Sequence, residues 1–161
     1  MKKRLCIGLC LCLLLCGCQK QNTAKFYYQR ASYVYGKADG VIAAEKRDIT
    51  GNEHNLPFLI SLYLVGPLSD EYTVPFNGKV KLLQMEEADG ILCLTFTDCS
   101  SFLSDLQFTV SCASLAMTCV ELCEADCITI HSGERTLSLT RDVLTLYDSG
   151  LPNAATEGEN K

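Results

Sequence analysis

Two Asp-Gly pairs lie fifty residues apart, at Asp39-Gly40 and at Asp89-Gly90, and apolar or β-branched residues flank each pair. Such a pair between two apolar runs predicts a β-hairpin with a type I′ turn, because both central residues of that turn need a positive φ. A segment of helical character follows each predicted hairpin. The repeated order constrains the chain to two ββα units and suggests a weak internal duplication.

The apolar run that follows the first pair, residues 56–65, could by itself be a strand or a helix. The residues around it favour a helix. Asn55 can cap the first turn, Pro57 is tolerated inside that turn, and Gly66 with Pro67 supplies a stop.

The second unit has clearer periodicity. Residues 91–97 alternate as a strand, with Leu92, Leu94 and Phe96 on one face. A helix is expected over 101–125, where apolar residues repeat at helical spacing. The predicted buried stripe comprises Leu103, Leu106, Val110, Ala113, Met117 and Val120.

Two further alternating segments close the domain. Residues 127–131 and 136–140 are expected strands, and the apolar residues of 143–147 extend the last strand or close the sheet. The resulting order, ββα-ββα-β, predicts an α+β fold in which two helices pack on one face of a mostly antiparallel sheet.

The N-terminus has the pattern of an export signal. Basic residues at 2–4 precede thirteen apolar residues, Leu5 to Gly17, whereas a membrane-spanning helix needs about 20. Leu15-Cys16-Gly17-Cys18 then resembles the bacterial lipobox, which implies that Cys18 becomes the lipidated N-terminus. Two acyl chains anchor a protein stably, so we expect this protein to be held on the outer face of the cell membrane. An ordinary cleaved signal peptide is the alternative.

These patterns divide the chain into a signal peptide (1–17), a polar tether (18–25), one folded domain (26–147) and a disordered tail (148–161). Loss of the signal peptide removes three basic residues. Eleven basic residues then face nineteen acidic ones, for a net charge of −8. An acidic surface argues against nucleic acid as a partner.

Catalytic side chains are scarce. His54 and His131 are the two histidines, and neither lies in a recognisable catalytic or phosphate-binding motif. Glu86 and Glu87 are adjacent to the second predicted turn. They are more simply interpreted as a solvated hairpin tip than as a general acid/base pair. We therefore expect no enzyme activity and no cofactor.

Six cysteines follow Cys18 in the mature chain: Cys93, Cys99, Cys112, Cys119, Cys123 and Cys127. Cys119, Cys123, Cys127 and His131 recur every four residues, but on one helix each step rises about 6 Å, too far for four ligands of one ion. We expect no metal site. An exported protein can keep disulfides, so the pairing of the six stays open. Cys112, Cys119 and Cys123 lie beside the predicted stripe, where free cysteine acts as a small apolar residue.

The pattern of residues 26–147 resembles the GerM-like domain of Gram-positive, spore-forming bacteria. The resemblance lies in these segments: Glu45–Asp48, Leu62–Pro67, Val74-Pro75, Gly78–Val80, Asp89–Thr95, Leu115–Val120 and Ile128–Gly133. The sequence departs from the GerM-like pattern at Thr95 and at Asp126-Cys127. The resemblance implies a membrane-anchored envelope protein of sporulation or germination, related to modules that associate side by side.

Together these observations predict a non-enzymatic interaction module, anchored in the membrane through Cys18. The expected partner is an envelope protein or a second copy, bound at an exposed sheet edge. One rival is a lipoprotein that binds a small ligand, which needs a concave pocket. The other is a thiol redox or metal-binding protein.

Overall fold

The computed structural model describes residues 21–32 and 40–148, and for 145–148 it describes the backbone alone. The elements run in this order: β1 (Thr23–Gln29), β2 (Ile42–Asp48), α2 (Leu56–Val65), the 3₁₀ turn η1 (Pro75–Gly78), β3 (Leu82–Ala88), β4 (Ile91–Phe96), α3 (Asp105–Leu122), β5 (Cys127–Ser132), β6 (Arg135–Thr140) and α4 (Arg141–Asp148). The described part of the chain therefore follows ββα three times, and the predicted α+β class is confirmed.

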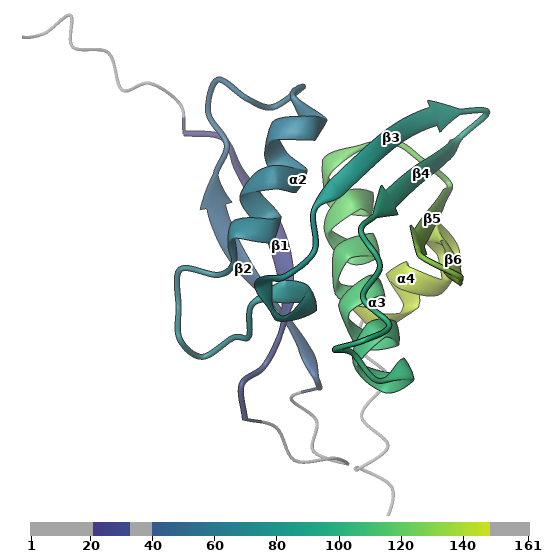
Figure 1. The fold of residues 1–161 in the computed structure, drawn as a ribbon. Coiled ribbons are helices and arrows are strands. Elements are labelled where there is room, and N and C mark those ends of the chain that lie inside the picture. The colour runs from purple at the N-terminus through teal and green to yellow at the C-terminus, as the bar shows by residue number, and fades with distance from the viewer. Residues whose placement is uncertain (1–20, 33–39, 149–161) are drawn as a thin grey trace, which may run out of the picture.

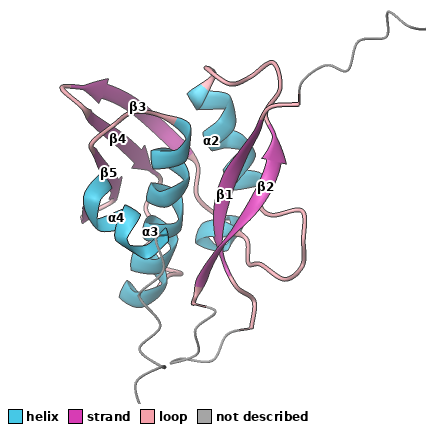
Figure 2. Cartoon of the chain, turned by 180° about the vertical axis from the view of Figure 1, so that it is seen from behind, coloured by secondary structure: helices cyan, strands magenta, loops and turns pink. Residues whose placement is uncertain are grey.

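The strands form two sheets with the long helix α3 between them (Figure 1). β1 and β2 make an antiparallel pair on one side of α3. On the other side lies a four-stranded sheet in the order β3-β4-β5-β6. Seen from behind, the pair β1 and β2 lies in front of α2, and α4 lies beside α3 (Figure 2).

This arrangement corrects the expectation of a single sheet with two helices on one face. The strand β1 is the reason, because Phe26, Tyr27 and Tyr28 are all buried and a strand at the border of a solvated sheet would expose every second residue. Its edge meets α3, where the backbone N–H of Tyr27 donates to Thr118 Oγ1 at 2.9 Å. β1 is thus covered by α3 and does not extend the larger sheet.

The four-stranded sheet is mixed. β4 and β5 are parallel and α3 connects them, whereas β3 with β4 and β5 with β6 are antiparallel pairs. A parallel pair needs a long crossover, which α3 supplies. On β4 and β5, Leu92, Leu94, Ile128 and Ile130 point into the core and are fully buried, as their alternation predicts.

The predicted turn at Asp89-Gly90 is confirmed. Both residues have positive φ, 52° and 76°, and they join β3 to β4 in a two-residue hairpin. Of the first pair, Asp39 lies outside the described residues, and Gly40 has a φ of 65°. The strands on either side of it, β1 and β2, are antiparallel partners.

The helix α2 is also confirmed, with the bounds expected from its flanking residues. The side chain of Asn55 accepts a hydrogen bond from the Phe58 N–H, Pro57 lies in the first turn, and Gly66 is the C-cap with a φ of 112°.

The helix α3 is shorter than expected and is buried on a different face. It begins after Ser104, whose side chain and that of Gln107 form a reciprocal capping box. The predicted stripe is correct only in part: Leu103 is buried, but Leu106 is 61% exposed and the other four members are half-buried. The fully buried side chains of α3 are Cys112, Leu115, Ala116, Thr118 and Cys119. A helix between two sheets needs two apolar faces, so one stripe cannot describe it.

The chain ends differ from the prediction as well. β1 begins at Thr23, inside the segment expected to be a tether. Residues 143–147 belong to α4, so their predicted role as a strand is wrong. Thr140 Oγ1 donates to the Asp142 carboxylate, and an acid in the first turn favours a helix through its dipole. The predicted tail (148–161) overlaps the end of α4 at Asp148, and its other residues lie outside the described residues, as does the signal peptide.

Candidate functional site

Cys18, the predicted lipidation site, lies outside the described residues, so the structure does not place it. Across residues 21–32 and 40–148, no helix is both long enough and apolar enough to cross a membrane.

The other residues that could suggest chemistry are not brought together. His54 is in the turn before α2, and His131 is on β5, where its Nδ1 lies 2.9 Å from Thr136 Oγ1. Glu86 and Glu87 are exposed on β3, and Glu86 accepts a hydrogen bond from Gln84. In the part of the chain that the structure describes, no group of three or more His, Cys, Asp or Glu side chains could hold a metal ion.

The six cysteines are free thiols in the structure. Cys99, Cys112 and Cys119 are fully buried in the core. Burial raises the pKa of the Cys112 and Cys119 thiols well above the usual value, which disfavours the reactive thiolate. Cys93 and Cys127 are half-buried on the sheet face that points away from α3.

That sheet face has no layer over it among the described residues, and we call it the open face. On β4, β5 and β6 it includes Cys93, Thr95, Cys127, Thr129, His131, Thr136 and Ser138, and on β3 the neighbouring Gln84 and Glu86. Thr129 Oγ1 and Ser138 Oγ lie 3.0 Å apart, and the His131–Thr136 pair makes a second cross-strand contact. Small uncharged polar side chains therefore dominate this surface on β5 and β6, whereas β3 adds the charge of Glu86.

Among the described strands, three have a free edge, and two of these carry features that discourage pairing. β2 ends in the charged run Glu45–Asp48. β3 carries Glu86 and Glu87 and has an irregular register between Leu82 and Gln84. Charges and bulges are devices that natural proteins use against edge-to-edge association.

The third free edge, β6, has no such protection beyond its first residue. Its remaining sequence, Thr-Leu-Ser-Leu-Thr over 136–140, contains no charge, proline or irregular register. Ser132 and Arg135 are partners across a two-residue turn, so the backbone groups of Thr136, Ser138 and Thr140 point outward. Among the described residues, no backbone group of a turn or loop bonds to those of Thr136 or Ser138, whereas Thr140 leads directly into α4.

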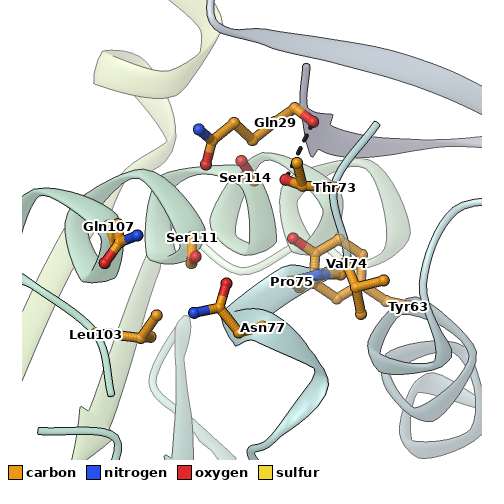
Figure 3. A pocket seen from close by; sticks show the side chains of 10 residues that line it. All are labelled: Gln29, Tyr63, Thr73, Val74, Pro75, Asn77, Leu103, Gln107, Ser111 and Ser114. Atoms are coloured by element: carbon orange, nitrogen blue, oxygen red, sulfur yellow. Dashed lines mark hydrogen bonds between the residues drawn. The ribbon is translucent and has the colours of Figure 1, made fainter. Parts of the chain in front are cut away.

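A cavity of about 130 Å³ lies where β1, α2, η1 and α3 converge (Figure 3). Its lining is mostly polar and entirely uncharged: Gln29, Tyr63, Thr73, Val74, Pro75, Asn77, Leu103, Gln107, Ser111 and Ser114. Asn77 and Gln107 are exposed, whereas Tyr63 and Ser114 are buried. The cavity therefore leads from the surface to buried hydroxyl groups.

Tyr63 reaches the inner end of this cavity from α2. Its ring is fully buried and stacks on the Tyr28 ring, with centroids 5.0 Å apart. The hydroxyl oxygen points toward the cavity between Ser114 and Asn77 (Figure 3). This oxygen has no hydrogen-bond partner among the described residues. Burial raises the pKa of the Tyr63 phenol, so the hydroxyl stays protonated and can donate a hydrogen bond.

The segment η1 brings Asn77 to the cavity in an unusual backbone conformation. Phe76 and Asn77 have φ of 50° and 54°, and Gly78 follows with 66°. The buried Phe76 ring, 5.4 Å from the Phe96 ring, holds the segment in place. Left-handed conformations in succession are rare outside glycine, and no pattern in the sequence indicated them.

Sequence reasoning missed this cavity, because its walls come from four elements that are distant along the chain. Gly66-Pro67 and Val74-Pro75 marked the ends of the connecting loop, but nothing in the sequence indicates that the Tyr63 hydroxyl is left without a partner.

Comparison with protein-family models and with curated proteins finds no match. Among solved structures, the chain is similar to a provisionally named lipoprotein from Clostridium perfringens, with 13% sequence identity and a TM-score of 0.43. The similarity covers 76% of this chain and 89% of the other. These comparisons show no family for the chain, and its GerM-like resemblance stays a prediction.

Proposed function

We propose that this chain is a lipid-anchored, non-enzymatic protein on the outer face of the cell membrane, and that it binds an extended segment of an envelope protein at β6. The single observation that carries the binding role is the uncharged free edge of β6, since the other two free edges are protected. An extended peptide can add to such an edge through main-chain hydrogen bonds.

The anchor is supported by the sequence. The lipobox-like Leu15–Cys18 follows an apolar segment too short to span a membrane. Only four residues separate Cys18 from Thr23, where β1 begins. They span at most about 15 Å, so an anchored domain stays close to the lipid surface. This raises its local concentration toward partners in the same membrane.

The GerM-like resemblance supplies the biological setting of the proposal. It assigns the partner to the envelope proteins of sporulation or germination, with a second copy of this chain as the other candidate. The two candidates share the same binding mode, because β6 could pair with a strand of either one.

The anchor is tested by fractionation of cells that express Cys18→Ala. We expect this variant to leave the washed membrane fraction, since it lacks the thiol that carries the lipid. Cys16→Ala is the matched control, because it removes a nearby thiol but keeps a small residue in the lipobox. Persistence of Cys18→Ala in washed membranes would show that the lipobox interpretation is wrong.

The binding edge is tested by crosslinking and affinity capture from intact cells, both growing and starved. Ser138→Lys places a charge on β6, and Gln84→Lys places the same charge on β3, the opposite edge of the same sheet. We expect Ser138→Lys to lose a defined partner that both the parent and Gln84→Lys retain. A partner set unaffected by Ser138→Lys would exclude β6 as the binding edge.

A further inference from the structure

We propose that the cavity around Tyr63 is a binding site for an acetamido group, either in a small molecule or as a pendant group of a larger one. This inference is independent of the proposed function, since the cavity and β6 share no residue. It starts from the Tyr63 hydroxyl, a fully buried donor that points into the cavity and has no partner among the described residues.

A buried hydroxyl without a hydrogen bond is unfavourable, so its presence at the inner end of an open cavity calls for a partner that enters from outside. The cavity is large enough for one. Its volume of about 130 Å³ is several times the roughly 30 Å³ that one water occupies in the liquid. The cavity therefore admits a group of several non-hydrogen atoms, such as an acetamido group.

The chemistry of the lining matches the parts of that group. Its carbonyl oxygen can accept a hydrogen bond from the Tyr63 hydroxyl. Its N–H can donate to the side-chain amide oxygen of Asn77, which lines the cavity and is exposed at the entrance. Its methyl group can pack against the apolar side chains of Val74 and Pro75. No charged side chain lines the cavity, which disfavours anions and cations, because a buried charge needs a counter-charge.

Other lining groups keep hydrogen-bonding capacity for a ligand. Gln107 uses its Oε1 to accept from Ser104, which leaves its amide N–H₂ available as a donor near the entrance. Ser114 donates to the carbonyl of Val110 and so presents lone pairs to the cavity. Because Asn77 and Gln107 are exposed at the entrance, the remainder of a larger molecule can extend into solvent.

The test uses the full chain purified in detergent, with binding measured by saturation-transfer NMR and by thermal shift. Acetamide and acetate are compared first, because they have nearly the same shape and differ in charge. N-acetylglucosamine and an acetyl-lysine peptide then distinguish two sources of the same group. We expect saturable binding of acetamide and of at least one larger acetamido compound, and none of acetate.

Tyr63→Phe removes the donor and keeps the ring. Loss of one hydrogen bond predicts affinity about 3- to 10-fold weaker. Tyr28→Phe is the matched control, since it removes the same atom from the stacked ring, which does not line the cavity, and we expect less than twofold change. Ser111→Ala, on the cavity wall, is a second variant that should also weaken binding.

Three results would overturn the proposal. One is the absence of saturable binding by any acetamido compound, which would mean that the cavity holds water only. Another is equal binding of acetate and acetamide. The third is unchanged affinity in both Tyr63→Phe and Ser111→Ala. None of these results bears on the capture experiment with Ser138→Lys, so failure at one site is distinguishable from failure at the other.

Discussion

Arginine side chains hold separate segments of this chain together by donating to backbone carbonyls. Arg47 on β2 is 5% exposed and donates to the carbonyls of Leu62 and Gly66 at the end of α2. It also pairs with Glu45, which in turn accepts from the loop after α2. Arg141 donates in the same way to three carbonyls around the end of α3. Both residues satisfy helix ends that lack capping side chains.

The Arg47→Met variant should unfold about 3 kcal/mol more easily than the parent. It leaves the carbonyls of α2 without donors and the half-buried Glu45 without its cation, and breaking a buried ion pair is strongly destabilising. Urea denaturation followed by circular dichroism gives the value. Lys46→Met, at the exposed neighbouring position, should change stability by less than about 0.5 kcal/mol. Similar effects of the two variants would contradict this role for Arg47.

Five of the six described cysteines should separate into two reactivity classes. Cys99, Cys112 and Cys119 are fully buried, and burial raises the pKa of the last two, so we expect them to resist iodoacetamide at pH 8 until the chain unfolds. Cys93 and Cys127, half-buried on the open face, should react first. Mass spectrometry after timed labelling measures each site. Rapid native labelling of Cys112 would show that the core opens locally.

At the scale of elements, η1 stores backbone strain next to the cavity. Asn77 has a φ of 54°, and a left-handed conformation is unfavourable by roughly 1–2 kcal/mol for a residue with a side chain. Asparagine tolerates this region better than most residues, but glycine tolerates it best. The strain is retained where Asn77 presents its amide to the cavity, a combination common at ligand sites.

The Asn77→Gly variant should therefore be more stable, by about 0.5–1 kcal/mol, while it binds acetamido compounds less tightly. Thermal unfolding and saturation-transfer NMR on the same samples give the two values. Gly78→Ala is the opposite control, because its φ is 66° and a new Cβ would lie 3.3 Å from Val74 Cγ1, so it should lower stability. If Asn77→Gly were less stable than the parent, the strain would not be real.

At the scale of the whole molecule, α3 is the element that joins the two sheets. It packs against β1 on one side and against the four-stranded sheet on the other (Figure 1). Thr118 lies at the contact with β1, fully buried, and accepts from the Tyr27 N–H while it donates to the Ser114 carbonyl. Because both sheets share this helix, we expect the described domain to unfold in a single cooperative transition.

The Thr118→Val variant keeps the shape of the side chain and removes the acceptor. It should lower the free energy of unfolding by about 2 kcal/mol, because a buried backbone N–H loses its hydrogen bond to the helix. Thr109→Val, on the exposed face of the same helix, should have an effect below about 0.5 kcal/mol. Guanidinium denaturation compares the two. Two separate transitions in the parent would contradict the shared-helix view.

Local signals in the sequence were sufficient wherever neighbouring residues decide the conformation. The turn at Asp89-Gly90 follows from the need for two positive φ values, and α2 follows from Asn55, Pro57 and Gly66. The alternation of Leu92, Leu94 and Phe96 correctly gave the buried face of β4. The export signal and lipobox are also local, and they support the proposed anchor without help from the fold.

Tertiary structure decided the features that depend on contacts between distant residues. The buried face of α3 was predicted correctly only in part, because a helix packed on two sides needs two apolar faces and periodicity reports one. The separation into two sheets depends on β1 meeting α3 through Tyr27 and Thr118, 91 residues apart. The cavity depends on η1, α2, α3 and β1 together, and the Tyr63 hydroxyl lacks a partner only because of how those elements meet. Such contacts arise from packing of the whole chain, so no single segment contains the information that specifies them.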